Sequence, residues 1–392
     1  MNANDCLLIS GPKIYAENGV VENAALLIEA GVIHRIDSQA AFRDVLANEV
    51  LTFPDSYHLI PGFIDMHTHG VNGHDVMDAT EDALAGISKA LAAEGTTGFL
   101  ATTMTASIEK IESALVAVRD FMQQKNPGAE VLGVHLEGPF LAPSKMGAQP
   151  GDKIIPPNVA LLEHWQAISD NSIRLVTLAP EQPNCAELIV YLKQHKIIAS
   201  LGHTNATYDE AVHAIDLGCT HATHLFNAMR AVHHREPGVV TAALLSDDVL
   251  VELVLDGFHL HPAIVQLVLK AKGPERIVLI TDAIRAKCLS DGCYELGGQD
   301  VHVKNGEAKL ADGTIAGSVL KMASAVSNML RFTGCELEVA VRMASATPAK
   351  ALGLFDRKGS IALGKDADLV VLDDQLNVVL TVCGGRVVVG GC

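Results

Sequence analysis

Short apolar runs alternate with amphipathic stretches through the middle of the chain, from about Gly62 to about Thr347. The amphipathic stretches, such as EDALAGISKALAAE and IEKIESALVAVRDFM, have helical periodicity. Strands that alternate with helices predict a parallel sheet, and eight such units predict an α/β fold whose sheet closes into a (β/α)8 TIM-like barrel. The eight apolar runs are LIPGFID, TTGFLATT, VLGVHLE, IRLVTLAP, IIASLGH, THATHLF, LVELVLDGFH and RIVLITD.

The two ends of the chain have a different pattern. The first sixty or so residues contain short apolar runs broken by Gly and Asn, and the C-terminal segment GSIALGKDADLVVLDDQLNVVLTVCGGRVVVGG has the same style. Such runs are typical of short strands. We therefore expect residues 1–61 and 348–392 to form one small β-sandwich, and residues 62–347 to form a metal-dependent barrel.

Polar side chains follow the predicted strands. In a barrel of parallel strands the active site lies at the carboxyl ends of the strands. The first run leads to His67 and His69, an HxH pair whose alternate positions face the same way. A lone HxH pair is more often two surface or core histidines, but ligand types at several strand ends predict a metal site. The later strand ends carry Glu137, His203, His224, His259 and Asp282.

The residue types indicate the ion and the chemistry. Four imidazoles and one carboxylate suit Zn or Fe better than Mg or Ca. Asp282 either caps a helix or carries a proton between an activated water and a leaving group, and beside a metal site we expect the catalytic role. His259 is not needed as a ligand. We expect it to polarise a substrate carbonyl or to bond a hydroxyl, with a core histidine as the alternative.

Composition excludes several partners. The formal net charge of −17 argues against nucleic acid, because phosphate backbones require Lys and Arg. One local Arg can still hold the phosphate of a small molecule. The sequence contains no apolar stretch of about 18 residues, so it predicts no membrane span. The N-terminus does not have the pattern of a secretory signal. The eight cysteines are scattered without a CxxC pair, so we expect reduced thiols and a cytoplasmic protein.

Several longer segments together resemble one family. PGFIDMHTHG, HLEGPF, GAQP, THLFNAM, HHREPG and TDAIRAK, in this order, resemble the N-acetylglucosamine-6-phosphate deacetylases of the amidohydrolase superfamily. The HxH pair and the strand-eight Asp indicate the superfamily alone, whereas HLEGPF, THLFNAM and HHREPG are more specific. The resemblance implies hydrolysis of N-acetyl-D-glucosamine 6-phosphate to D-glucosamine 6-phosphate and acetate, in amino-sugar catabolism or cell-wall recycling.

The resemblance also implies roles for single residues. Glu137, His203 and His224 match the principal metal ligands, and His67 and His69 match an extra pair found in members with two metals. The implied cofactor is a divalent transition metal, Zn or Fe with Mn or Co as alternatives, one or two per subunit. Asp282 matches the catalytic acid/base. Substrate-binding positions of the family match Ala148, Gln149, Asn227, Ala228, Arg235, His259, Ile315, Ala316 and Gly317.

The resemblance also bears on the phosphate contact, on the contact made by Gln149 and on the residue that bridges the metals. Arg235 corresponds to a phosphate-binding arginine that a neighbouring subunit can supply, so the resemblance implies a homodimer that binds an amino-sugar phosphate. Some relatives have a His where Gln149 stands, which leaves that contact open. Many amidohydrolases with two metals bridge them with a carboxylated Lys after strand four, but this chain has TLAPE there, so Glu137 is the available bridge.

Two alternatives remain at this point. The first is another amidohydrolase, such as a cyclic-amide hydrolase or a dipeptidase, which should lack the grouping of Asn227, Ala228 and Arg235. The second is a barrel relative without catalytic activity. Such proteins lose metal ligands, whereas all five candidate ligands and Asp282 stand in this sequence.

Overall fold

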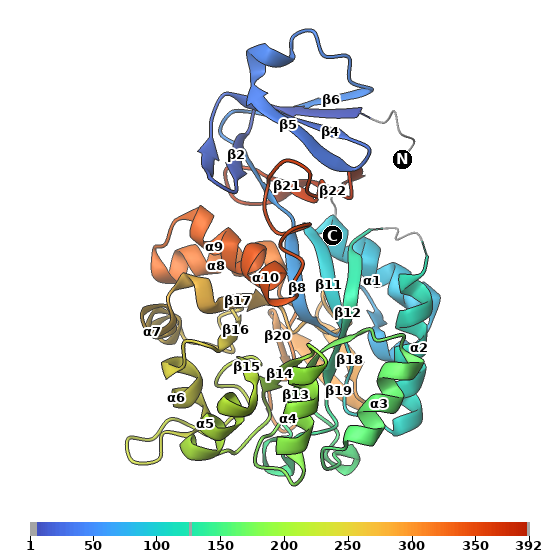
Figure 1. Cartoon of the computed structure of the whole chain (residues 1–392), viewed down its shortest axis with the longest axis vertical. Helices are drawn as coiled ribbons and strands as arrows, with labels where there is room; N and C mark the ends of the chain where they lie inside the picture. The colour runs from blue at the N-terminus through green and yellow to red at the C-terminus, as the bar shows by residue number, and fades with distance from the viewer. Residues whose placement is uncertain (1–5, 125–127, 390–392) are drawn as a thin grey trace.

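A barrel and a smaller β-sandwich make up the molecule, and segments from both ends of the chain build the sandwich (Figure 1). The computed structural model describes residues 6–124 and 128–389. Among these residues, no helix combines the length and the apolar character needed to cross a membrane.

Eight parallel strands form the barrel, and each of the eight predicted runs contributes one of them. The sheet follows chain order from β8 to β17. Its two edges meet where Asp282 N donates to His67 O at 2.8 Å and where Thr68 pairs with Ala283. The predicted barrel is therefore confirmed. Its strands are β8 (Phe63–Thr68), β11 (Thr96–Thr102), β12 (Glu130–Glu137), β13 (Ile173–Leu178), β14 (Ile198–Leu201), β15 (Cys219–Ala222), β16 (Leu250–Val254) and β17 (Ile277–Ile280).

Helices surround the barrel (Figure 1). Several begin at a side chain that accepts a backbone N–H: Thr80, Ser107 and Thr207 do so at the starts of α1, α2 and α5. Such caps satisfy donors that the helix itself leaves free. The helices are α1 (Glu81–Ala93), α2 (Ile108–Met122), α3 (Val159–Ile168), α4 (Cys185–Gln194), α5 (Tyr208–Leu217), α6 (Gly238–Leu245), α7 (Pro262–Lys272), α8 (Met322–Thr333), α9 (Leu337–Ala344) and α10 (Ala346–Ala351).

The sandwich consists of two mainly antiparallel sheets with their own apolar core. One has the order β5-β4-β1-β6, and the other has the order β23-β22-β21-β7-β2-β3, so C-terminal strands pair with N-terminal ones. This confirms the predicted sandwich, while its boundaries after residues 61 and 347 stay predictions. The strands are β1 (Cys6–Ser10), β2 (Lys13–Ala16), β3 (Gly19–Val21), β4 (Ala24–Glu29), β5 (Val32–Ser38), β6 (Glu49–Thr52), β7 (His58–Pro61), β21 (Leu369–Leu372), β22 (Val378–Cys383) and β23 (Arg386–Val389).

A small three-stranded sheet after β17 was not predicted. It contains β18 (Gly292–Leu296), β19 (Gln299–Lys304) and β20 (Glu307–Lys309), and the pair Gly297–Gly298 joins its first two strands. Two glycines between segments in which apolar and polar residues alternate are typical of a β-hairpin. The sequence therefore contained a signal for this element. A bridge between Lys309 and Ile315 attaches the following loop to the sheet. A further short hairpin, β9 (Gly70–Val71) with β10 (His74–Asp75), follows β8.

Candidate active site

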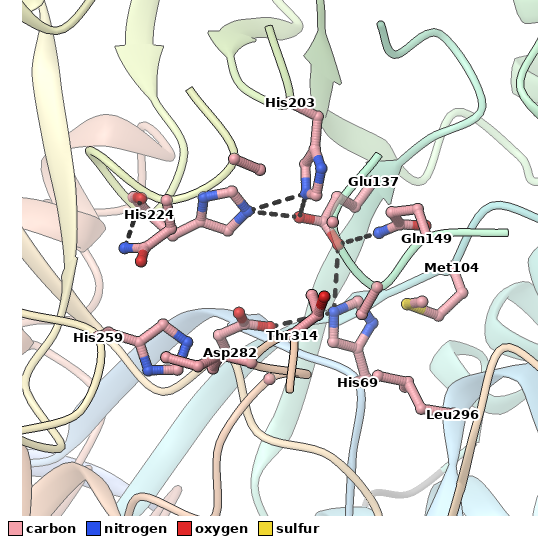
Figure 2. A pocket seen from close by; sticks show the side chains of 16 residues that line it. His69, Met104, Glu137, Gln149, His203, His224, His259, Asp282, Leu296 and Thr314 are labelled. Atoms are coloured by element: carbon pink, nitrogen blue, oxygen red, sulfur yellow. Dashed lines mark hydrogen bonds and ion pairs between the residues drawn. The ribbon is translucent and has the colours of Figure 1, made fainter. Parts of the chain in front are cut away.

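The five predicted metal ligands and Asp282 converge at the carboxyl ends of the barrel strands. Figure 2 shows His69, Glu137, His203, His224 and Asp282 directed toward one another. Each comes from the end of a different strand or from the one or two residues that follow it. All are buried, with Asp282 the most exposed at 8%. The barrel therefore collects in space the polar positions that lie far apart in the sequence.

The metal-ligating atoms form two triads. His67, His69 and Asp282 make one, and Glu137, His203 and His224 make the other. Within each triad the candidate ligand atoms lie within 4.8 Å of one another. Asp282, which the sequence suggested as a proton carrier, thus also stands among the groups that can hold an ion.

Glu137 belongs to the second triad and also faces the histidines of the first. Its Oε1 is 3.4 Å from His67 Nε2, 3.3 Å from His203 Nε2 and 3.1 Å from His224 Nε2. Its Oε2 is 3.2 Å from His69 Nε2. One carboxylate therefore faces imidazoles of both triads, which is the geometry that a bridging ligand requires.

The backbone bends sharply where the ligands leave their strands. His203, His224 and Asp282 have φ values of 46°, 30° and 49°, a region that residues with a Cβ rarely adopt. Such strain persists only where surrounding contacts hold it, and it concentrates at functional sites. At Asp282 the carbonyl accepts the N–H of Ser318 at 2.7 Å. Gly317 must be glycine, because its φ is 59° and a Cβ would lie 2.8 Å from Asp282 O.

The donors fit one or two divalent ions. His67 Nε2 is buried between Glu137 and Asp282, yet it has no hydrogen-bond partner in residues 6–124 and 128–389. The Nδ1 atoms of His69 and His203 lie 3.2 Å from Thr102 O and 2.9 Å from Lys145 O, so both rings turn Nε2 toward the site. Outer partners of this kind orient the imidazoles of metal centres. Nitrogen and carboxylate ligands together suit transition ions such as Zn or Fe.

The carboxylates of Glu137 and Asp282 favour positive charge among the ligands of the two triads. Burial lowers the pKa of His69, but its contacts with Asp282 and Glu137 outweigh burial and raise that pKa to about 9. Burial raises the pKa of Asp282, but His67 and His69 outweigh it and lower that pKa to about 2. A site that stabilises imidazolium charge so strongly presents the electrostatic environment that a bound cation needs.

A cavity of about 340 Å³ opens onto the triads. Most of the predicted substrate-binding residues line it, and two do not. Ala316 is buried, and its N–H donates to Ala308 O instead. Arg235 is exposed in the loop before α6, where its Nη1 lies 2.8 Å from His234 Nε2. The predicted residues that do line the cavity are Ala148, Gln149, Asn227, Ala228, His259, Ile315 and Gly317.

Two of these cavity residues have fixed orientations. Gln149 Nε2 donates to Glu137 Oε2 at 2.8 Å, and Gln149 Oε1 accepts the N–H of Thr105 at 2.8 Å. His259 Nδ1 lies 2.6 Å from Asp256 Oδ2. Burial lowers the pKa of His259, but the hydrogen bond to Asp256 and the negative charges of Asp256 and Asp282 together outweigh burial and raise the pKa overall. Gln149 therefore also holds the carboxylate between the triads, and His259 presents Nε2 to the cavity.

Several residues of the site were not predicted from the sequence. Met104, Leu296 and Thr314 also line the cavity. Leu296 and Thr314 come from the unpredicted three-stranded sheet and the loop that follows it; the pair Gly297–Gly298 signals the hairpin in the sequence but not its position beside the cavity. Glu252 stands behind His67, and its only signal was a charge within the apolar run LVELV.

Comparison with known proteins identifies the relatives of this chain. Residues 58–388 match the Amidohydrolase family. An N-acetylglucosamine-6-phosphate deacetylase from Bacillus subtilis is 45% identical over 98% of this chain and 97% of its own length. An N-acetylgalactosamine-6-phosphate deacetylase from Escherichia coli is 38% identical over 93% of this chain and 95% of its own length.

A solved structure extends the likeness to the fold. It is a mutant N-acetyl-D-glucosamine-6-phosphate deacetylase from Mycobacterium smegmatis in complex with N-acetyl-D-glucosamine-6-phosphate, with a TM-score of 0.91 and 33% identity. The alignment covers 98% of this chain and 100% of that one. The chain therefore belongs to the amidohydrolase family, and within it to the N-acetylglucosamine-6-phosphate deacetylases.

Proposed function

We propose that this protein hydrolyses N-acetyl-D-glucosamine 6-phosphate to D-glucosamine 6-phosphate and acetate. The observation that carries the proposal is the position of Glu137, which lines the cavity and whose two carboxylate oxygens face imidazoles of both ligand triads. The relative with 45% identity acts, by its name, on this sugar phosphate. The reaction serves amino-sugar catabolism or cell-wall recycling, in the cytoplasm.

The chemistry needs a nucleophile, a polarised carbonyl and a proton for the departing amine. A bound Zn or Fe ion supplies Lewis acidity, which makes water nucleophilic near neutral pH and polarises the acetamide oxygen. Asp282 faces the cavity from the end of β17, with its Oδ1 3.3 Å from His69 Nε2. In the proposed reaction Asp282 accepts the proton of the attacking water and delivers it to the amine nitrogen.

The remaining cavity residues position the sugar phosphate. His259 bonds the acetamide or a sugar hydroxyl, Asn227 and Ala228 contact the phosphate end, and Gln149 holds Glu137. The loop of Ile315 and Gly317 closes one side. No Lys or Arg is among the described residues that line the cavity. We therefore propose a homodimer in which Arg235 of the partner subunit binds the phosphate, because a guanidinium pairs bidentately with phosphate oxygens.

The test is acetate release by the purified protein from a set of matched substrates. We expect N-acetylglucosamine 6-phosphate to have the highest kcat/KM. Unphosphorylated N-acetylglucosamine should be slower by at least about a hundredfold, since the groups that bind phosphate would lie unpaired. Faster turnover of the unphosphorylated sugar or of a cyclic amide would overturn the proposal. Faster turnover of N-acetylgalactosamine 6-phosphate would move the substrate to the epimer named for the relative with 38% identity.

A further inference from the structure

Glu252 is a buried carboxylate that the proposed mechanism does not use. It lies in β16, inside the barrel, and is 0% exposed. Its Oε2 lies 3.3 Å from His67 Nδ1 and 3.3 Å from His224 N. Its Oε1 has no hydrogen-bond partner in the described residues. One oxygen of Glu252 therefore contacts a member of each triad.

Burial of this side chain is costly without a compensating role. A carboxylate removed from water needs a cation or several hydrogen bonds to be stable. In residues 6–124 and 128–389, no Lys or Arg forms an ion pair with Glu252, and His67 is its ion-pair partner. The neighbours of Glu252 in the sequence are Val251 and Leu253, both apolar and fully buried. An apolar residue would suit this strand better if packing were the sole requirement.

The geometry at His67 identifies the role. The imidazole has one nitrogen 3.3 Å from Glu252 and the other 3.4 Å from both Glu137 and Asp282. Neutral imidazole carries its proton on one nitrogen, and the partner of that nitrogen decides which one it is. An acceptor at Nδ1 fixes the proton there and turns the Nε2 lone pair toward the triad.

We propose that Glu252 is a positioning residue that holds His67 in the Nδ1–H form and thereby sets the ion affinity of the His67/His69/Asp282 triad. This inference rests on the proposed function, since it concerns the ion that this function requires. It deepens that function by naming a residue behind the ligands that decides whether the second ion is retained.

The same residue supports the other triad through the backbone. Glu252 O accepts the N–H of Leu225 at 2.9 Å, and Glu252 Oε2 accepts the N–H of His224. These two bonds hold the turn in which His224 adopts its φ of 30°. Because the main-chain bond survives any substitution of the side chain, we expect the Glu137/His203/His224 triad to be affected less than the triad that contains His67.

Two substitutions test the proposal by ion binding, without reference to turnover. Zn²⁺ is titrated into chelator-treated full-length protein and followed by calorimetry. Glu252→Leu removes the acceptor and should weaken one of two binding events by about 10- to 100-fold. Glu252→Gln keeps an acceptor oxygen and should restore affinity to near the wild-type value. Equal affinities in all three proteins, or equal losses in both variants, would overturn the inference.

A control and a second measurement separate positioning from stability. Gln166 is also buried and polar, and it bonds the main chain of Ile173 far from the triads. Gln166→Leu should lower Tm without changing ion binding. If Glu252→Leu does not fold, 15N NMR of the wild-type histidines with Zn²⁺ bound still decides. A proton on His67 Nδ1 and ligation through Nε2 support the proposal, and ligation through Nδ1 overturns it.

These measurements also distinguish failure of this inference from failure of the proposed function. Wild-type protein that binds two Zn²⁺ and releases no acetate would overturn the proposed function. The Zn²⁺ affinities of the wild type and the two Glu252 variants would still decide the inference about Glu252. Active wild-type protein whose Glu252→Leu variant binds both ions normally would overturn the inference alone.

Discussion

Strand β12 begins and ends with a glutamate, and the two have opposite surroundings. At the amino end, Glu130 lies 2.8 Å from Arg357 Nη2 and 2.8 Å from Lys358 Nζ. At the carboxyl end, Glu137 lies within 3.1–3.4 Å of imidazole nitrogens and has no Lys or Arg as an ion-pair partner in the part of the chain that the structure describes. The two carboxylates stand seven positions apart on one strand, and they differ in exposure as well as in partners: the side chain of Glu130 is 37% exposed and that of Glu137 is 2% exposed.

The partners of each carboxylate bear on its role. Burial raises the pKa of Glu130, but Arg357 and Lys358 outweigh it and lower that pKa, so the carboxylate is neutralised by groups that are always charged. Burial also raises the pKa of Glu137, but the imidazoles of His67, His203 and His224 outweigh burial and lower that pKa. Imidazoles offer lone pairs as well as protons, which Lys and Arg cannot do. A carboxylate among imidazoles is therefore suited to a metal ion, and one among Lys and Arg to joining segments of the fold.

The largest expected effect is at the carboxyl end of the strand. Glu137→Gln removes the charge shared by both triads, so ion content and activity should fall together. We expect kcat/KM to drop by about 10⁴-fold or more, because carbonyl polarisation and water activation are lost at once. Metal analysis and acetate release measure the two quantities. A variant that keeps its ions and its activity would show that the contrast with Glu130 has no functional meaning.

Asp282→Asn should have the next largest effect. The amide keeps an oxygen for the His67/His69/Asp282 triad but cannot accept the water proton, so kcat should fall by about 10²- to 10⁴-fold. Ion content should change far less than kcat. Steady-state kinetics and metal analysis of the same preparation check both points. Retained turnover would remove Asp282 from the mechanism, and equal losses of ion and turnover would make it chiefly a ligand.

Lys358→Met sharpens the comparison from the amino end. The substitution leaves Asp368 and Glu130 without the ammonium group that contacts both. We expect the free energy of unfolding to fall by about 3 kcal/mol, as when one partner of a buried pair is removed. Denaturant unfolding measures this change. Ion content and kcat of the folded protein should stay at wild-type values, and a selective loss of either would contradict a purely structural role.

The last effect is absent at neutral pH and concerns His221, whose pKa is shifted by burial. Burial lowers the pKa of His221 to about 3, whereas an unfolded histidine titrates near 6.5. The unfolded state therefore binds the extra proton between these values, so stability rises with pH through this window and is lost as pH falls below about 6.5. The contribution is about 1.4 kcal/mol per pH unit. Urea unfolding of ion-free protein should show a shallower pH dependence in His221→Gln, and an unchanged slope would contradict this.

The sequence predicted the barrel, which the structure confirms, and the candidate ligands, whose role stays a prediction, because both follow from local patterns. Apolar runs of strand length mark the barrel, and the ligands stand at the ends of those runs. The sequence did not indicate the positions of Arg235 and Ala316, since one lies on an exposed loop and the other turns into the core of a small sheet. The sequence shows Glu252 as a charge within an apolar run but does not indicate its role, which depends on His67, 185 positions away. Contacts between distant segments leave no periodic pattern.

Catalysis depends, in the proposed function, on ions that the six side chains of the two triads bind: His67, His69, Asp282, Glu137, His203 and His224. The most direct test measures ion content and N-acetylglucosamine 6-phosphate deacetylation together, during chelator treatment and then during stepwise return of Zn²⁺ or Fe²⁺. We predict that activity disappears with the ions and returns in proportion to the ion bound, up to two per chain. Full activity in protein stripped of its ions would contradict the claim.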